Sequence, residues 1–162
     1  MTKQTDGHQW NHLIGVAGAG YWGKNLVRNF HDLQALGAVC DNDTERLEGF
    51  KQQYPAVRMV NAYSDLLHDP AIKAVAIATP AESHAHAVRE ALLAGKDVFV
   101  EKPLCLSIDE GKKLVALAKE RDRILMVGHL LWYHPAVLKL KELIDKGELG
   151  RIQYVYSNRL NL

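Results

Sequence analysis

Cysteine, unbalanced charge and long apolar runs are scarce in this sequence, and each scarcity excludes a class of protein. The 162 residues include two cysteines without metal-ligand spacing, so we expect reduced thiols, no metal site and a cytoplasmic location. Lysine and arginine total 20 and aspartate and glutamate total 19, so no basic stripe predicts a nucleic-acid partner. No apolar run reaches the roughly 18 residues of a membrane span, and residues 1–12 lack the apolar core of a signal peptide.

What the sequence does contain is a regular alternation of short apolar runs and amphipathic segments. The runs predict strands at 13–17, 36–40, 58–60, 74–78, 98–100 and 124–127. Helices are predicted at 21–35, 44–54, 65–68, 83–94, 107–121 and 135–146. Strands that alternate with helices predict an α/β fold with a doubly wound parallel Rossmann sheet of order 3-2-1-4-5-6. Ligands should bind at the carboxyl ends of its strands.

The pattern changes after the last helix. Residues 151–162, RIQYVYSNRLNL, alternate and are rich in tyrosine and valine, which predicts a strand. Because the sheet is already complete, we expect a polar segment at 1–12, a dinucleotide-binding domain at 13–150, and at 151–162 the first strand of a truncated second α/β domain. Without sheet neighbours, that strand should be disordered, folded back or paired with another copy of the chain.

A glycine-rich turn after the first strand is the central motif. Gly18, Gly20 and Gly23 form G-x-G-x-x-G between a predicted strand and a predicted helix. Gly18 permits the tight turn, Gly20 lets a pyrophosphate approach the backbone, and Gly23 lets the helix lie close to the strand. The free N–H groups at the helix N-terminus favour phosphate. The motif therefore predicts a dinucleotide site, with a glycine-rich turn of another α/β fold as the alternative.

An acid ends the second strand. Asp41 is predicted to accept hydrogen bonds from the adenosine ribose and to repel a 2′-phosphate, so that NAD is preferred to NADP. The alternative is a solvated turn acid in Asp-Asn-Asp. Arg46 is near enough to contact the adenine or a phosphate, which would partly relax the preference.

A lysine follows the fifth strand, within Glu101-Lys102-Pro103. At the carboxyl end of a central strand, Lys102 should point into the cleft where a nicotinamide lies, and Pro103 biases it away from helical geometry. A lysine in that place is suited to carry the proton of an alcohol under oxidation. By itself, the tripeptide is better explained as a surface Glu–Lys pair at a strand end.

Several motifs in a fixed order resemble a known family. They are G-A-G-Y-W-G-K-N (18–25), the acidic end of the second strand, T-P-x-x-x-H (79–84), A-G-K-D-V-F-V-E-K-P (94–103) and V-G-H (127–129). Over about residues 12–150 the chain resembles the Gfo/Idh/MocA oxidoreductases, the family of glucose–fructose oxidoreductase and inositol dehydrogenase. The resemblance implies a nicotinamide-dependent sugar dehydrogenase.

The same resemblance implies roles for individual residues. Lys102 would be catalytic, beside substrate and nicotinamide. The implied cofactor site comprises Gly18, Gly20, Tyr21, Trp22, Gly23, Asp41, Arg46, Thr79, Pro80, His84, Glu101 and Lys102. Candidate substrate contacts are His129, Arg159 and Asn161. For His84 and His129 a capping or core role is equally open, and the other six histidines should be solvated or structural.

Within the family, Y-W-G-K-N and Y-S-N-R-L-N-L resemble most the dehydrogenases of bacterial surface-polysaccharide synthesis. These oxidise the C3 hydroxyl of UDP-N-acetylglucosaminuronic acid or a close relative, which implies a nucleotide-sugar substrate; another polyol such as inositol is the alternative. Members carry a second domain that bears a further catalytic histidine and the main subunit interface. We therefore expect a homo-oligomer at full length and an inactive chain alone.

Two other function classes stay open from the sequence. One is a non-catalytic module that senses NAD. The other is a methyltransferase, because a glycine loop and an acid after the second strand also suit S-adenosylmethionine; the third glycine and Lys102 argue against it.

Overall fold

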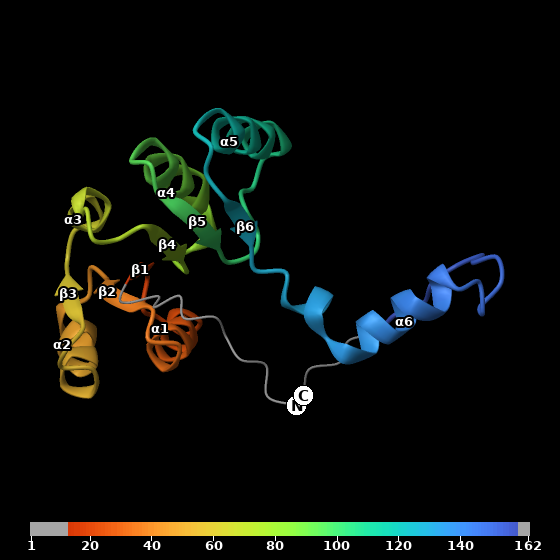
Figure 1. The fold of residues 1–162 in the computed structure, drawn as a ribbon, viewed down its shortest axis with the longest axis horizontal. Coiled ribbons are helices and arrows are strands. Elements are labelled where there is room, and N and C mark those ends of the chain that lie inside the picture. The colour runs from red at the N-terminus through yellow and green to blue at the C-terminus, as the bar shows by residue number, and fades with distance from the viewer. Residues whose placement is uncertain (1–12, 159–162) are drawn as a thin grey trace. The chain divides into compact units, whose positions relative to one another are not determined.

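The computed structural model describes residues 13–158 (Figure 1). Contacts within the chain divide it into two compact units, Met1–Gly128 and His129–Leu162. The first unit ends at Gly128, directly after the last strand of the sheet, and the predicted extent of the dinucleotide-binding domain, 13–150, stays a prediction.

The first unit is built on a parallel sheet. Its strands are β1 (Ile14–Ala17), β2 (Leu36–Cys40), β3 (Arg58–Val60), β4 (Ala74–Ile77), β5 (Asp97–Val100) and β6 (Leu125–Val127). They pair in parallel in the order β3-β2-β1-β4-β5-β6. The doubly wound sheet and strand order predicted from the sequence are thus confirmed.

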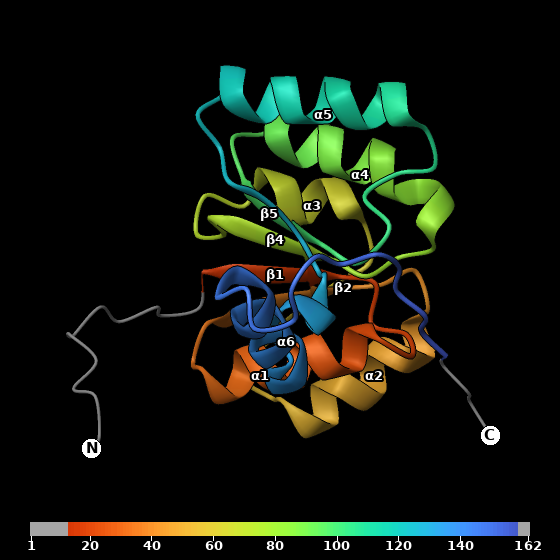
Figure 2. The same cartoon turned by 90° about the vertical axis from the view of Figure 1, so that its right-hand side faces the viewer.

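Helices cover both faces of this sheet, as Figure 2 shows. One face carries α1 (Gly23–Asp32) and α2 (Thr44–Gln53), and the other carries α3 (Tyr63–His68), α4 (Ala81–Leu93) and α5 (Ile108–Glu120). Side chains alternate along each strand, so Val16 packs with the α1–α2 core and Ala17 with the α3–α5 core. A strand covered on both faces must be apolar throughout, which explains the continuous apolar run of β4.

Helix ends differ from the predicted ones by a few residues. The helix predicted at 21–35 is shorter, because Gln34 adopts a left-handed φ of 58° after Asp32. The N–H of Ala35 then returns to the carbonyl of Phe30, and that of Gln34 to His31, which closes the last turn. The starts of α3 and α4 lie two residues earlier than the sequence predicted.

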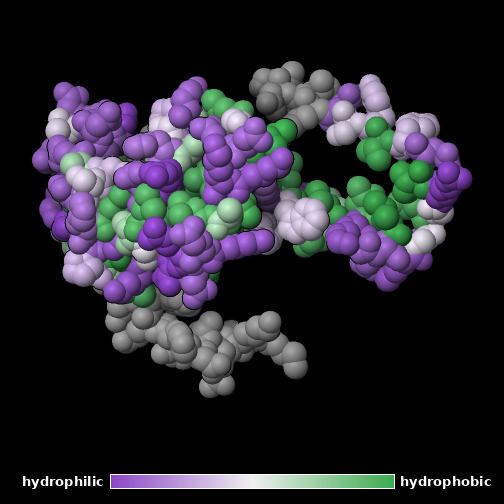
Figure 3. All heavy atoms as spheres, turned by 90° about the horizontal axis from the view of Figure 1, so that it is seen from above, coloured by the Kyte–Doolittle hydropathy of each residue, from purple (hydrophilic) through white to green (hydrophobic). Residues whose placement is uncertain are grey.

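The second unit contains a 3-10 turn, η1 (Leu130–Tyr133), and α6 (Pro135–Asp145), close to the predicted 135–146. The Nδ1 atom of His134 accepts a hydrogen bond from the N–H of Ala136 at 3.2 Å and caps α6. Apolar side chains of this unit are exposed, and several are visible in Figure 3.

Residues 151–158 form no strand, and no neighbouring strand within the described residues offers the hydrogen bonds of a ladder. That this segment is the first strand of a second domain stays a prediction. The rest of the predicted strand lies outside the described residues. Among the helices of residues 13–158, none has the length and hydropathy needed to cross a bilayer.

Candidate functional site

A hollow of about 800 Å³ lies at the carboxyl ends of β1, β2 and β4. Here the chain leaves β1 toward one face of the sheet and β4 toward the other, so the two connections diverge between neighbouring strands. Such a switch point is where open α/β sheets bind ligands. The walls are Ala17, Gly18, Gly20, Tyr21, Trp22, Cys40, Asp41, Asn42, Arg46, Asn61, Tyr63, Ala78, Thr79, Pro80, Ser83, His86 and Ala87.

The three glycines after β1 meet different surroundings. Gly18 has a φ of +85°, and a Cβ there would lie 2.8 Å from the backbone of Ala78. A Cβ on Gly23 would lie 1.8 Å from the carbonyl oxygen of Gly18, so any side chain would push α1 off the strand. A Cβ on Gly20 would meet no protein atom within 4 Å. The first and third glycines thus serve packing, and the second leaves open space that a ligand can enter.

The N-terminus of α1 opens beside Gly20. Trp22 at the N-cap makes no side-chain hydrogen bond to the helix, and the first turn carries no acid. The N–H groups of Lys24 and Asn25 donate to the carbonyls of Gly20 and Trp22, whereas those of residues 21–23 have no partner within the described chain. These N–H groups and the positive end of the helix dipole favour an anion. Tyr21 and Trp22 lie exposed at this end with their rings 5.5 Å apart, and the ammonium of Lys24 lies 5.1 Å from the Tyr21 ring centre.

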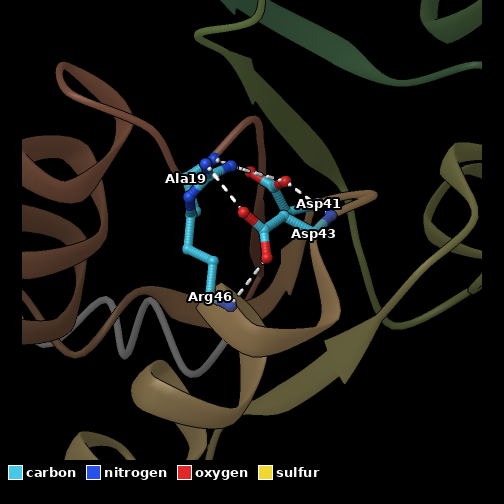
Figure 4. Close-up of polar contacts among 4 residues, drawn as sticks. All are labelled: Ala19, Asp41, Asp43 and Arg46. Atoms are coloured by element: carbon cyan, nitrogen blue, oxygen red, sulfur yellow. Dashed lines mark hydrogen bonds and ion pairs between the residues drawn. The ribbon is translucent and has the colours of Figure 1, made fainter.

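Asp41 joins the end of β2 to the glycine loop (Figure 4). Its Oδ2 accepts from the N–H of Ala19 at 2.7 Å, and its Oδ1 accepts from the N–H of Asp43 at 3.0 Å and from Nη1 of Arg46 at 2.8 Å. The side chain is 4% exposed. Burial alone would raise its pKa, but the backbone N–H groups and the Arg46 guanidinium outweigh burial and hold the pKa below its usual value.

Arg46 makes a second ion pair and faces the same hollow. Its Nη2 lies 3.0 Å from Oδ2 of Asp43, which also caps α2 by accepting from the N–H of Arg46. The pKa of the guanidinium is raised by its hydrogen bond to Asp41. A carboxylate has about four acceptor positions, and three are used within Asp41. One acceptor position of Asp41 remains for a ribose hydroxyl. The neighbouring Arg46 guanidinium can form an ion pair with a phosphate.

Five polar wall residues were not predicted as site residues from the sequence: Asn42, Asn61, Tyr63, Ser83 and His86. The hydroxyl of Tyr63 donates to the carbonyl of Ala87 at 2.9 Å, and burial raises its pKa. Asn61 directly follows β3, so its place at a strand's carboxyl end was a usable signal. Ser83 and His86 lie three residues apart in α4, so they share one face of that helix.

The lysine turn after β5 lies outside the hollow's walls. The N–H of Glu101 donates to the carbonyl of Ile77 at 2.8 Å, so this turn lies next to the end of β4. The Lys102–Pro103 peptide bond is cis. Lys102 is exposed, and its ammonium makes no hydrogen bond or ion pair with any residue of the described chain. It is available to a ligand that reaches this edge.

The surroundings of His84 favour the capping or core role over the expected contact with the cofactor. Its ring is 1% exposed, and its two nitrogens lie against the carbonyl oxygens of Pro103 and Thr79. No ring nitrogen remains for a dinucleotide. His129 belongs to the second unit, and the expected substrate contacts Arg159 and Asn161 lie outside the described residues. Within residues 13–158, no group of three or more His, Cys, Asp or Glu could hold a metal ion.

A doubly wound sheet, an uncapped helix after a glycine loop and a buried acid at the end of β2 together define a dinucleotide-binding protein. The sequence model of the Gfo/Idh/MocA family, described as "Oxidoreductase family, NAD-binding Rossmann fold", matches residues 12–129. The chain belongs to this family of NAD-binding Rossmann-fold oxidoreductases.

Relatives include characterised dehydrogenases. The scyllo-inositol 2-dehydrogenase (NAD(+)) of Bacillus subtilis is 35% identical over 147 residues, which are 88% of this chain and 42% of that protein. The scyllo-inositol dehydrogenase of Lactobacillus casei, solved with NAD(H) and scyllo-inositol, superposes with a TM-score of 0.79 at 27% identity. That match covers 86% of this chain and 42% of the other.

A nucleotide-sugar enzyme is also among the similar structures. The UDP-N-acetylglucosamine 3-dehydrogenase of Acidithiobacillus ferrooxidans has a TM-score of 0.73 and 29% identity, over 80% of this chain and 42% of that one. The chain thus spans less than half the length of the relatives it matches.

Proposed function

We propose that this chain is the NAD-binding part of a dehydrogenase that oxidises a hydroxyl group of a polyol, with inositols as the first candidate substrates. The observation that supports this proposal most strongly is the hollow at the β1–β4 switch point. There Gly20 leaves room for a pyrophosphate, and Asp41 is fixed by hydrogen bonds where it can accept from a ribose. Similarity to the scyllo-inositol dehydrogenases supports the choice of substrate class.

Each part of the site has a defined task in this reaction. The free N–H groups of residues 21–23 at the start of α1 and the space at Gly20 hold the pyrophosphate, and Asp41 accepts from the adenosine ribose. When bound, NAD supplies the acceptor for the hydride that leaves the alcohol carbon. Lys102 takes the proton that leaves the hydroxyl oxygen, so the carbonyl product forms without free charge on that oxygen. The role requires the neutral amine, whose lone pair takes the proton and leaves an ammonium, and no residue among 13–158 occupies Nζ of Lys102 by a hydrogen bond or ion pair.

A nucleotide sugar is the second candidate substrate, supported by the UDP-N-acetylglucosamine 3-dehydrogenase similarity. The expected place in surface-polysaccharide synthesis receives no support from the relatives, among which inositol dehydrogenases recur. We also propose a cytoplasmic location, in keeping with the free thiols of Cys40 and Cys105, and self-association of the full protein.

The test combines cofactor titration with a substrate panel. NAD, NADP and S-adenosylmethionine are titrated by calorimetry, and NADH formation is followed by absorbance with myo-inositol, scyllo-inositol and UDP-N-acetylglucosamine in the full protein. We expect NAD binding and turnover of an inositol. Turnover of the UDP-sugar alone would favour the second candidate. NAD binding without turnover of any hydroxyl substrate would favour a sensing module, and failure to bind NAD would refute the proposal.

A further inference from the structure

His84 lies where two functional turns meet. It belongs to the first turn of α4, and its ring is 1% exposed. Its Nε2 lies 2.8 Å from the carbonyl oxygen of Thr79, and its Nδ1 lies 2.6 Å from that of Pro103. Both distances are those of hydrogen bonds. The imidazole is therefore a bridge between two stretches of backbone that lie 24 residues apart in the sequence, and not a group directed at the hollow.

The two stretches belong to different parts of the proposed reaction. Thr79 lines the dinucleotide hollow at the end of β4. Pro103 follows Lys102, the proposed proton carrier at the end of β5. The strands β4 and β5 are paired up to Ile77 and Val100, and the N–H of Glu101 donates to Ile77 just beyond. Past this pairing, the His84 ring places one nitrogen within hydrogen-bond distance of a carbonyl in each turn. The Lys102 side chain has no partner of its own among residues 13–158, so its position depends on the backbone that carries it.

The chemistry of the ring makes this bridge specific to histidine. Both partners are carbonyl oxygens, which only accept. A neutral imidazole carries one N–H and serves one of the two carbonyls, and the doubly protonated ring serves both. The planar ring places one nitrogen against each carbonyl on two different sides, whereas an amide side chain such as glutamine has a single nitrogen. The rigid ring can hold the two turns at a fixed separation, which a flexible side chain cannot do.

We propose that His84 is a positioning residue that fixes the Lys102 turn relative to the cofactor wall at Thr79. The inference rests on the proposed function of Lys102. Reacting groups must be held near attack geometry, and a displacement of about 1 Å can cost on the order of a hundredfold in rate. Loss of the bridge changes the place of the lysine and leaves the glycine loop and Asp41 intact, so turnover and NAD binding respond differently.

The first measurement uses the unmodified chain. Long-range ¹H–¹⁵N spectra report the ring nitrogens of each histidine, and the His84 signals are assigned by their loss in His84→Gln. We expect at least one His84 ring N–H to exchange slowly with water, whereas the exposed His68 ring exchanges fast. Fast exchange of both His84 ring positions would overturn the bridge.

The second measurement separates positioning from a purely structural role. In His84→Gln we expect the Nζ and Cε signals of Lys102, assigned with Lys102→Arg, to shift, while the NAD dissociation constant changes less than about twofold. In the full protein, kcat for the polyol should fall about tenfold with KM for NAD little changed. His68→Gln is the matched control and should change none of these. An unshifted Lys102 signal with normal kcat, or a parallel loss of NAD binding, would overturn the inference.

Folding of the variant is checked by circular dichroism. His84→Asn, with the same donor pair on a shorter side chain, is the second variant, and failure of both to fold would overturn the positioning role in favour of a structural one. The Lys102 spectra need no substrate, so they test the inference separately from the proposed function. If Lys102→Met keeps full turnover, the proposed function fails, whatever the Lys102 signals show.

Discussion

The ends of β2 and β5 each carry a charged side chain next to the proposed cofactor, and the two are held in opposite ways. The carboxylate of Asp41 is buried and accepts from Ala19, Asp43 and Arg46. The ammonium of Lys102 is exposed and has no partner among the described residues. A group that binds gains from being fixed in advance, because less ordering remains when the ligand arrives. A group that exchanges a proton must stay accessible, so its backbone is held instead.

The largest expected effect is the loss of turnover when the exposed Lys102 is replaced. Lys102→Met keeps the length and apolar stem of the side chain and removes the proton carrier. We expect kcat for the polyol to fall about a hundredfold or more while NAD affinity is nearly unchanged. Steady-state kinetics and NAD titration measure both, with Lys112→Met on the exposed face of α5 as the control. Normal turnover in Lys102→Met would contradict the assignment.

Two matched substitutions in the glycine loop separate the glycine that serves packing from the glycine that leaves room for the cofactor. Gly23→Ala places a methyl 1.8 Å from the Gly18 oxygen, so it should lower the free energy of unfolding by about 1–3 kcal/mol. Gly20→Ala meets no protein atom, so stability should change by about 0.5 kcal/mol or less while NAD binding weakens. Urea denaturation and NAD titration give the two quantities. Equal NAD affinity in Gly20→Ala would show that the pyrophosphate does not approach this glycine.

Cofactor preference tests Asp41 directly. A 2′-phosphate would oppose the carboxylate in a partly dry site, so NAD should be preferred to NADP by about 1–3 kcal/mol. Asp41→Ala should abolish the preference and also weaken NAD itself, because the N–H of Ala19 loses its acceptor. Arg46→Ala should widen the preference by removing the cation that can meet a phosphate. Calorimetry with both cofactors decides, and an unchanged preference in Asp41→Ala would refute the assignment.

The smallest expected effect is on acid stability. The folded pKa of Asp41 lies below its unfolded value of about 3.9. Its charged form therefore stabilises the fold above that value, and this contribution is lost as the pH falls through the folded pKa. Asp41→Asn should flatten the loss of unfolding free energy below about pH 4. Asp109→Asn, at an exposed site, should leave that slope unchanged. Equal slopes in the two variants would argue that Asp41 is not preferentially stabilised as a carboxylate.

The sequence by itself determined the parts that depend on local rules. Strand and helix alternation, the glycine spacing and the acid after β2 follow from periodicity and from backbone geometry at Gly18 and Gly23, so strand order and cofactor class were predictable. The tertiary structure decided what depends on distant partners. His84 lies against the carbonyl of Pro103, nineteen residues away, and turns from the hollow because a buried ring needs hydrogen-bond partners. Likewise, residues 151–158 alternate like a strand but form none, since a strand exists only when a neighbour completes its hydrogen bonds.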